Sequence, residues 1–175
     1  VTQAGLVPGD EAVVPWPSFP SFVRDTQKRG ATPVTVALRD GRIDLDRVLA
    51  AVRPSTRLAF VATPNNPTGT AVEPAALRAF VDALPEHVLA VVDEAYLEYL
   101  EPGSGDAVVD LHLQGRRVLV LRTFSKLYGL AGLRVGFAVG PADVIDSIRR
   151  VQRGYDVSTV AQAAAMASLG DPDEV

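Results

Sequence analysis

Short apolar runs recur along the chain, and segments with the periodicity of amphipathic helices separate them. Six runs rich in Val, Leu and Ala are bounded by turn residues, which predicts strands at residues 11–14, 33–38, 57–62, 88–92, 117–122 and 135–139. The segments between them predict helices at residues 21–29, 44–52, 74–84 and 141–151, and a last helix from residue 158 onward. Strands and helices therefore alternate along almost the whole chain.

Strands that are apolar on both sides are typical of parallel sheets covered by helices on both faces. The expected fold class is α/β, a mostly parallel sheet in a three-layer α/β/α arrangement, formed by a single domain over residues 1–175. Residues 63–70 contain two prolines and a glycine and cannot form regular structure. We assign no helix or strand to the looser stretch 97–114. Residues 1–6 resemble the end of a helix and lack an initiating Met, so we expect a piece of a longer protein.

The composition excludes several classes of function. The chain has 175 residues, 47% of them hydrophobic, and no cysteine; its two histidines, His87 and His112, lie far apart, so we expect no disulfide and no metal site. No apolar run reaches the ~20 residues of a transmembrane helix and no basic-then-apolar leader is present, so we expect no membrane partner and a cytoplasmic location. A net charge of −4 with mixed signs provides no basic stripe for nucleic acid.

The stretch 121–134 changes abruptly from an apolar strand to hydroxyls, a lysine, closely spaced glycines and an arginine. Lys126 comes shortly after a buried strand, and we expect the loss of hydration there to lower the pKa of its amine and make it a nucleophile toward a carbonyl. The hydroxyls and Arg134 would suit a phosphate. An ordinary strand exit with solvated charges is the alternative interpretation.

Polar residues also follow two other strongly apolar strands. Asn65 and Asn66 come after one, and Asp93 and Tyr96 after the next. Ligands bind beyond the carboxyl ends of the strands in such sheets, so we expect these groups to meet. Taken singly, each could be a turn, a helix cap or packing. Together with Lys126 they match what pyridoxal phosphate requires: a lysine for its aldehyde, an acid for its ring nitrogen and anion contacts for its phosphate.

Four stretches, in order, carry a resemblance to a known family. They are Pro8-Gly9-Asp10-Glu11, Pro64-Asn65-Asn66-Pro67-Thr68-Gly69, Val92-Asp93-Glu94-Ala95-Tyr96, and Thr123-Phe124-Ser125-Lys126 through Gly129-Leu130-Ala131-Gly132-Leu133-Arg134. The chain resembles the central part of a fold-type I pyridoxal-phosphate-dependent aminotransferase. Within that group it is most similar to the histidinol-phosphate aminotransferase family, including its aromatic, phenylalanine-type relatives. The resemblance implies the large, cofactor-binding domain of a longer aminotransferase, with the small domain and the N-terminal segment absent.

The resemblance implies roles around the cofactor ring. Lys126 would bond to the cofactor aldehyde and later act as the base that moves a proton. Asp93 would face the ring nitrogen and, as a carboxylate, keep it protonated. Tyr96 and Asn66 would hydrogen-bond the ring oxygen. These four residues would therefore hold the reactive part of the cofactor.

The same resemblance implies contacts to the rest of the cofactor. Thr123, Ser125 and Arg134 would hold the phosphate, the arginine by a charge-assisted contact. Phe19 would lie over the ring, and a plain core aromatic is the alternative interpretation. Residues 153–157 depart from the proline-aromatic-asparagine sequence of many relatives. That departure leaves the choice of substrate open.

The function that the resemblance implies is transfer of an amino group between histidinol phosphate or an aromatic amino acid and a 2-oxo acid such as 2-oxoglutarate, with a role in histidine or other amino-acid biosynthesis. A homodimer is expected, because sites of this family take a tyrosine from the partner subunit. We expect the 175-residue chain alone to be inactive. A decarboxylase or lyase of the same fold remains an alternative, because the cofactor residues do not decide which Cα bond breaks. A non-catalytic effector-binding domain of a transcription regulator is a second alternative.

Overall fold

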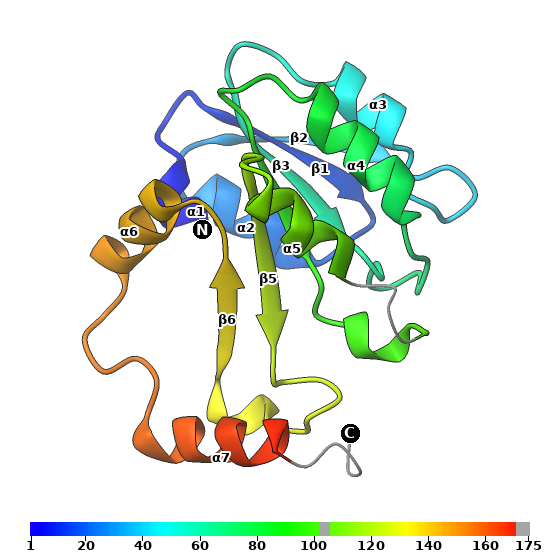
Figure 1. Cartoon of the computed structure of the whole chain (residues 1–175). Helices are drawn as coiled ribbons and strands as arrows, with labels where there is room; N and C mark the ends of the chain where they lie inside the picture. The colour runs from blue at the N-terminus through cyan, green and yellow to red at the C-terminus, as the bar shows by residue number, and fades with distance from the viewer. Residues whose placement is uncertain (102–105, 171–175) are drawn as a thin grey trace.

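A six-stranded sheet forms the centre of the structure, a computed structural model that describes residues 1–101 and 106–170. The strands are β1 (Glu11–Trp16), β2 (Thr32–Ala37), β3 (Thr56–Ala62), β4 (Leu89–Asp93), β5 (Val118–Thr123) and β6 (Gly136–Val139). Their order in the sheet is β2-β1-β3-β4-β5-β6 (Figure 1). Neighbours pair in parallel except β6, which is antiparallel to β5. The prediction of a mostly parallel sheet is confirmed.

The described residues form seven α-helices and two short 3-10 helices. They are α1 (Thr2–Gly5), α2 (Pro20–Lys28), α3 (Leu45–Ala50), α4 (Pro74–Ala83), η1 (Leu97–Tyr99), α5 (Asp106–Leu113), η2 (Ala131–Leu133), α6 (Ala142–Val151) and α7 (Thr159–Leu169). All five predicted helices are present, with ends within two residues of those expected. Asp44 caps α3 as its sequence position suggests, because its side chain accepts a hydrogen bond from the Arg47 backbone N–H at 3.2 Å.

Different helices cover the two faces of the sheet (Figure 1). Side chains of α3, α4 and α5 pack on one face, and those of α2 and α6, with Leu6 after α1, pack on the other. Along β4 the buried side chains alternate: Ala90 and Val92 join the first core, and Leu89 and Val91 join the second. Both faces exclude water, which explains why the strands read as uninterrupted apolar runs. The three-layer α/β/α arrangement is confirmed.

Strand β1 is longer than expected, because a proline did not end it. The sequence predicts an end at Val14, before Pro15, yet the strand continues to Trp16. Pairing of β1 with β3 stops at Val13, while pairing with β2 continues to Trp16. The Trp16 carbonyl accepts from the Leu38 N–H on the β2 side, so the nitrogen of Pro15 faces the side where pairing has already ended. The missing N–H therefore breaks no bond of the sheet.

Helix α5 is an α-helix that the sequence did not predict. It lies within the stretch 97–114, where one proline and two glycines obscured the helical pattern. Val108 and Leu111 of this helix are buried against Val118 and Val120 of β5. Packing against the sheet supports a short helix whose own sequence signal is weak.

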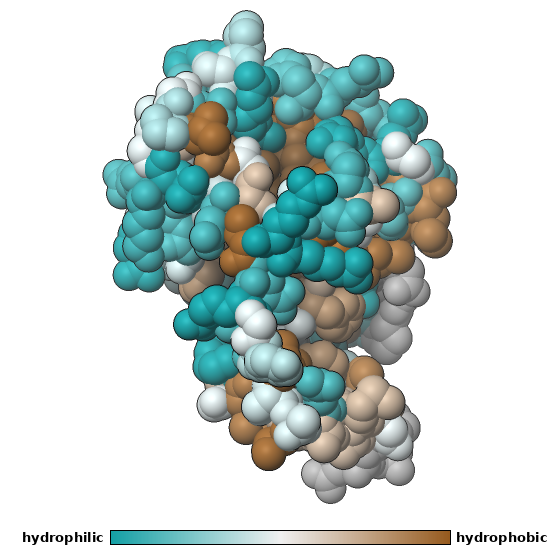
Figure 2. Space-filling view, turned by 90° about the vertical axis from the view of Figure 1, so that its left-hand side faces the viewer, coloured by the Kyte–Doolittle hydropathy of each residue, from teal (hydrophilic) through white to brown (hydrophobic). Residues whose placement is uncertain are grey.

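A smaller apolar cluster lies beyond the end of β5. Phe124 and Val135 pack there against Ala161 and Ala165 of α7. The opposite side of α7 is open, since Met166 is 70% exposed. Figure 2 shows apolar side chains on the surface at this end of the molecule. None of the helices formed by residues 1–101 and 106–170 is both long and apolar enough to cross a membrane.

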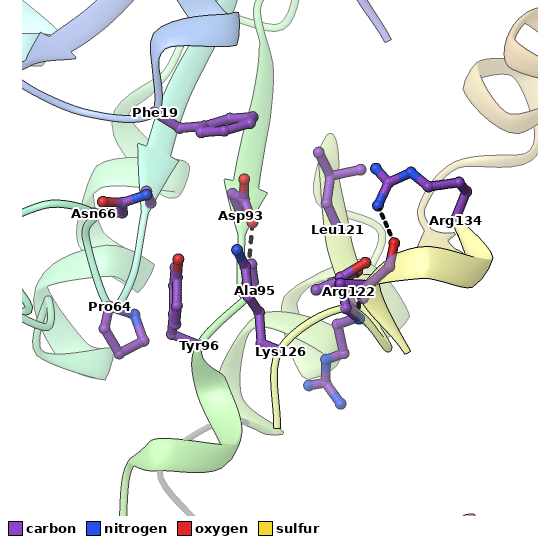
Figure 3. A pocket seen from close by; sticks show the side chains of 14 residues that line it. Phe19, Pro64, Asn66, Asp93, Ala95, Tyr96, Leu121, Arg122, Lys126 and Arg134 are labelled. Carbon is purple, nitrogen blue, oxygen red and sulfur yellow. Dashed lines mark hydrogen bonds between the residues drawn. The ribbon is translucent and has the colours of Figure 1, made fainter. Parts of the chain in front are cut away.

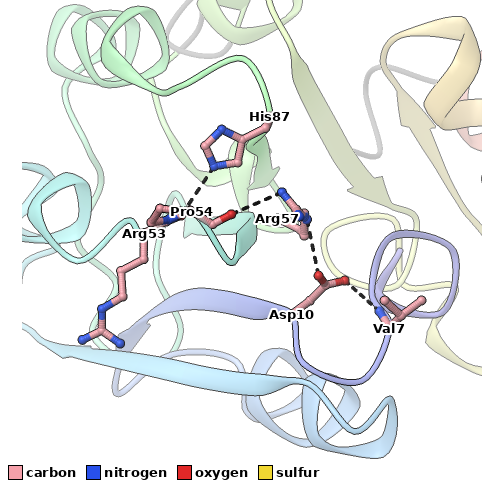
Figure 4. A network of polar contacts seen from close by, with 6 residues as sticks. All are labelled: Val7, Asp10, Arg53, Pro54, Arg57 and His87. Atoms are coloured by element: carbon pink, nitrogen blue, oxygen red, sulfur yellow. Dashed lines mark hydrogen bonds and ion pairs between the residues drawn. The ribbon is translucent and has the colours of Figure 1, made fainter.

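A polar network connects the turns at the amino ends of the strands (Figure 4). The Asp10 carboxylate accepts from the Val7 N–H at 2.9 Å and pairs with the Arg57 guanidinium at 3.3 Å. Arg57 also donates to the Pro54 carbonyl at 3.4 Å, and the ring of His87 lies 3.4 Å from the Arg53 carbonyl. The network lies before β1, β3 and β4 and so fixes the start of the strands whose opposite ends form the candidate site.

Candidate active site

A cavity of about 310 Å³ lies at the carboxyl ends of β3, β4 and β5 (Figure 3). Fourteen residues line it, and all eight site residues predicted from the sequence are among them: Phe19, Asn66, Asp93, Tyr96, Thr123, Ser125, Lys126 and Arg134. The remaining lining residues are Ala62, Pro64, Ala95, Leu121, Arg122 and Ala131. Segments that are far apart in the sequence therefore meet where parallel strands end, as expected for this type of sheet.

Asp93 is the last residue of β4 and points into the cavity (Figure 3). Its Oδ1 accepts a hydrogen bond from the Ala95 backbone N–H at 3.0 Å. Burial raises the pKa of the Asp93 carboxyl above its usual value, while the Ala95 N–H and the charge of Lys126 act in the opposite direction. The carboxylate is thus a partly buried anion whose surroundings favour a cationic partner.

Lys126 is one of the residues that line the cavity. Its Nζ is 5.0 Å from the centre of the Tyr96 ring, which is a cation–π contact. The side chain is exposed, so the expected loss of hydration is wrong for this chain. The physical reason is distance from the sheet, because β5 ends at Thr123 and the loop carries the lysine away from the buried strand. The amine and the Tyr96 hydroxyl nevertheless border the same cavity.

Hydroxyls and a guanidinium lie on the β5 side of the cavity. The Thr123 hydroxyl accepts from the Ser125 N–H at 3.1 Å, which closes a tight turn after β5. Arg134 follows η2 in the left-handed conformation, with φ 54° and ψ 45°, and donates to the Ala131 carbonyl at 2.6 Å. A left-handed arginine is unfavourable by about 1–2 kcal/mol, a strain typical of functional sites. This side of the cavity suits a phosphate group.

Phe19 lies across the cavity from Lys126 and Tyr96 (Figure 3). Its ring packs edge-on against Phe22 at 5.6 Å between centroids, and Phe22 in turn stacks on Phe60 at 4.5 Å. The side chain is nevertheless 42% exposed, so it is not a plain core aromatic. An aromatic surface held in this way can cover a planar ring.

Two buried polar residues that are not among the predicted cofactor contacts, Ser18 and Asn65, directly precede Phe19 and Asn66 in the sequence. Ser18 is 3% exposed and Asn65 is 2% exposed. The Ser18 hydroxyl donates to the Asn65 Oδ1 at 2.7 Å, and the Asn65 amide donates to the Pro17 carbonyl at 3.2 Å and to the Thr68 hydroxyl at 3.0 Å. These bonds join the loops after β1 and β3. The sequence marks Asn65 through the motif at residues 64–69, whereas the only sequence signal for Ser18 is its position beside Phe19.

The described part of the chain shows no group of His, Asp and Glu that could hold a metal ion. The cavity instead combines an amine, a carboxylate, an amide, hydroxyls and a guanidinium. Fold and cavity together define an α/β protein with a candidate ligand site at its strand ends, a cavity whose lining includes a lysine and an acid.

The family follows from comparison with known proteins. The model of the family described as aminotransferase class I and II matches residues 1–175, and the chain belongs to this family. It is 49% identical over 170 residues to a curated aromatic amino acid aminotransferase from Mycobacterium sp. (strain KMS), a match that covers 95% of this chain and 47% of that protein.

Solved structures agree with this family. The crystal structure of histidinol-phosphate aminotransferase from Sinorhizobium meliloti in complex with pyridoxal-5′-phosphate matches with a TM-score of 0.89 and 32% identity, over 98% of this chain and 47% of that chain. A mutant aspartate aminotransferase from Thermus thermophilus matches with a TM-score of 0.86 and 30% identity, over 99% of this chain and 49% of that one. The chain thus spans about half the length of the relatives that it matches.

Proposed function

We propose that this chain is the cofactor-binding part of a pyridoxal-phosphate-dependent aminotransferase. The observation that carries the proposal is the meeting of Lys126, Asp93 and Arg134 in one cavity within a chain of this family. The donor set fits the cofactor: an amine for the aldehyde, an acid for the ring nitrogen, and a guanidinium with hydroxyls for the phosphate. The related structure from Sinorhizobium meliloti, solved with this cofactor, supports the assignment.

When bound, the cofactor would supply an electron sink for the charge that develops as a bond to the substrate Cα breaks. Lys126 would hold the cofactor through its amine and, once released by the substrate, would take the proton from the substrate Cα and return it to the cofactor carbon that carried the aldehyde, as a general base and then a general acid. Because Lys126 is exposed, its amine would have room to move between these tasks. Asp93 would hold a proton on the ring nitrogen, since a partly buried carboxylate favours a cation beside it.

The other residues would orient the cofactor. Asn66 and Tyr96 would donate hydrogen bonds to the ring oxygen, and Phe19 would cover one face of the ring and exclude water from it. Thr123, Ser125 and Arg134 would hold the phosphate, a role supported by their position around the same cavity. Each of these roles is a proposal for the residue named.

For the substrates we propose an aromatic amino acid and a 2-oxo acid. The curated relative at 49% identity is named for aromatic amino acids, which supports this class over the others. Histidinol phosphate is the second candidate, because a solved neighbour at 32% identity is named for it. We further propose a homodimer, in which a partner subunit completes a cavity that this chain leaves open at Lys126. The longer polypeptide, rather than the 175-residue chain alone, would carry the activity.

Trapping the cofactor on a lysine tests the central assignment, since this chain contains only two lysines, Lys28 and Lys126. The polypeptide that carries the chain is mixed with pyridoxal phosphate, reduced with borohydride, digested and mapped by mass spectrometry. We expect label on Lys126 and loss of the bound-cofactor absorbance in Lys126→Ala. Lys28→Ala is the matched control, because Lys28 is 72% exposed and pairs with Asp25 on the surface. Absorbance that persists in Lys126→Ala would contradict the assignment.

Turnover assays separate the substrate classes. The polypeptide is offered phenylalanine, tyrosine, histidinol phosphate or aspartate together with 2-oxoglutarate. We expect the aromatic amino acids to give kcat/KM values at least about tenfold higher than the others, a difference of about 1.4 kcal/mol in transition-state binding. Release of carbon dioxide and an amine in place of an oxo acid would show a decarboxylase. Turnover by the 175-residue chain alone would contradict the need for the longer polypeptide.

A further inference from the structure

A buried ion pair lies beside the candidate active site, on the side away from the cavity. Nε of Arg122 donates to Oε2 of Glu94 at 2.8 Å. The Glu94 side chain is 1% exposed and that of Arg122 is 20% exposed. In the other ion pairs of the described residues, the carboxylate side chain is at least 12% exposed. Burying two charges costs hydration free energy, and the attraction between the charges barely offsets this cost. The presence of the buried Glu94–Arg122 pair is therefore poorly explained by a contribution to stability alone.

The pair joins β4 and β5 where both strands leave the sheet. The register of these strands ends at Asp93 opposite Leu121. The Glu94 N–H still donates to the Leu121 carbonyl at 2.9 Å, so Glu94 and Arg122 occupy the next step of the same ladder. Their side chains therefore tie the two strands together one residue beyond the last pair of the register.

The two faces of these strand ends have different tasks. Asp93, Leu121 and Thr123 line the cavity, and successive side chains of a strand point to opposite faces. Glu94 and Arg122 thus point to the other face. Figure 3 shows the Arg122 side chain extending away from Phe19 and Asp93, although Arg122 is one of the residues that line the cavity.

The residues next to the pair are those that would hold opposite parts of the cofactor. Asp93, which would meet the ring nitrogen, directly precedes Glu94. Thr123 directly follows Arg122 and begins the turn that leads to Lys126, which would meet the aldehyde. A shift of β5 along β4 would therefore change the distance between the Asp93 carboxylate and the Lys126 amine. Both groups must reach the same ligand at the same time.

We propose that Glu94 and Arg122 form a positioning pair that sets the spacing between Asp93 and Lys126, an inference that rests on the proposed cofactor. The guanidinium suits the task because its planar fork fixes direction as well as distance. Misplacement by about 1 Å can weaken a reaction by about 100-fold, so a small slip of the strands is enough to be measured.

Two ligands distinguish positioning from general stability. Pyridoxal phosphate can bond to the Lys126 amine, whereas pyridoxine phosphate, which carries an alcohol in place of the aldehyde, can use only the ring and phosphate contacts. The ratio of their dissociation constants in the polypeptide that carries the chain reports how well Lys126 is placed relative to the rest of the site. The variants are Glu94→Gln, which keeps shape and removes charge, and Arg122→Lys, which keeps charge and removes the fork. Thermal unfolding without ligand checks that each variant folds.

The matched control is the pair between Arg116 and Asp82, which has the same 2.8 Å separation but side chains that are 50% and 40% exposed. We expect the preference for pyridoxal phosphate to fall about tenfold or more in Glu94→Gln, to fall less in Arg122→Lys, and to stay within about twofold in Asp82→Asn. If Glu94→Gln does not fold, the double variant Glu94→Leu/Arg122→Met replaces it, because apolar substitution of a whole buried pair is often neutral for stability.

An unchanged preference in a folded variant would overturn the positioning pair, whether both affinities stay the same or both fall equally. The proposed function fails separately. If the unmodified protein does not prefer pyridoxal phosphate over pyridoxine phosphate, the cofactor assignment is wrong whatever the variants do.

Discussion

Asn65 and Asn66 are neighbours with opposite surroundings, and this contrast allows a quantitative test. The Asn65 side chain is 2% exposed and makes three hydrogen bonds, to Ser18, Pro17 and Thr68. Each bond contributes about 1 kcal/mol net, so we expect Asn65→Ala to lower the free energy of unfolding by about 3 kcal/mol. Asn66 lines the cavity, and we expect Asn66→Ala to change stability by less than about 0.5 kcal/mol while weakening pyridoxal phosphate binding.

Equilibrium unfolding in urea gives the free energies, and a double-mutant cycle tests the reasoning behind them. Ser18→Ala removes one of the three bonds and leaves the Asn65 oxygen without that donor, so we expect a loss of about 1–2 kcal/mol. In the Asn65→Ala background the same change should matter less, with a coupling of about 1 kcal/mol. Strict additivity within about 0.3 kcal/mol, or a cost of Asn65→Ala below about 1 kcal/mol, would refute the network.

Three further substitutions probe the core, the sheet edge and the acid. Phe60→Ala should lower the free energy of unfolding by about 3–5 kcal/mol in guanidinium chloride, because Phe60 is 2% exposed and stacks on Phe22. Gly136→Ala should cost about 1–3 kcal/mol and speed amide exchange in β5, since its new Cβ would lie 2.6 Å from the Arg122 carbonyl oxygen. Burial raises the pKa of Asp93, so the folded state binds its proton more tightly than the unfolded state. Stability should fall as pH rises from about 4 through the raised pKa, and urea unfolding of Asp93→Asn should show the loss of this dependence.

The positions of the cavity residues could be predicted from the sequence because each strand end is marked by a change from apolar to polar residues. Asp93 and Asn66 each follow an apolar run whose last residues are buried on both sides. Parallel strands bring their carboxyl ends to one edge, so the sequence predicts which polar groups meet. Helix α5 was not predicted because its own sequence has only a weak helical pattern, and the helix is stabilised by contacts with β5.

The supporting contacts could not be predicted, since they depend on register and on loop paths. Ser18 and Asn65 are separated by 47 positions, and Glu94 and Arg122 by 28. A shift of one residue between neighbouring strands would exchange the faces of their side chains. The exposure of Lys126 was misjudged for a similar reason, because the path of three loop residues after β5 decides whether its amine meets water.

A single rule nevertheless connects the supporting residues with the cavity residues. At these strand ends, one residue faces the cavity while its neighbour in sequence faces the interior and bonds to the next loop or strand. The pairs, cavity residue first, are Phe19 with Ser18, Asn66 with Asn65, Asp93 with Glu94, and Thr123 with Arg122, which also lines the cavity but directs its side chain away from Phe19 and Asp93. The interior members bond to one another, Ser18 to Asn65 and Glu94 to Arg122, so each bond fixes two cavity residues at once. Loss of an interior member should therefore disturb ligand contacts on two strands, whereas loss of a cavity member should disturb one.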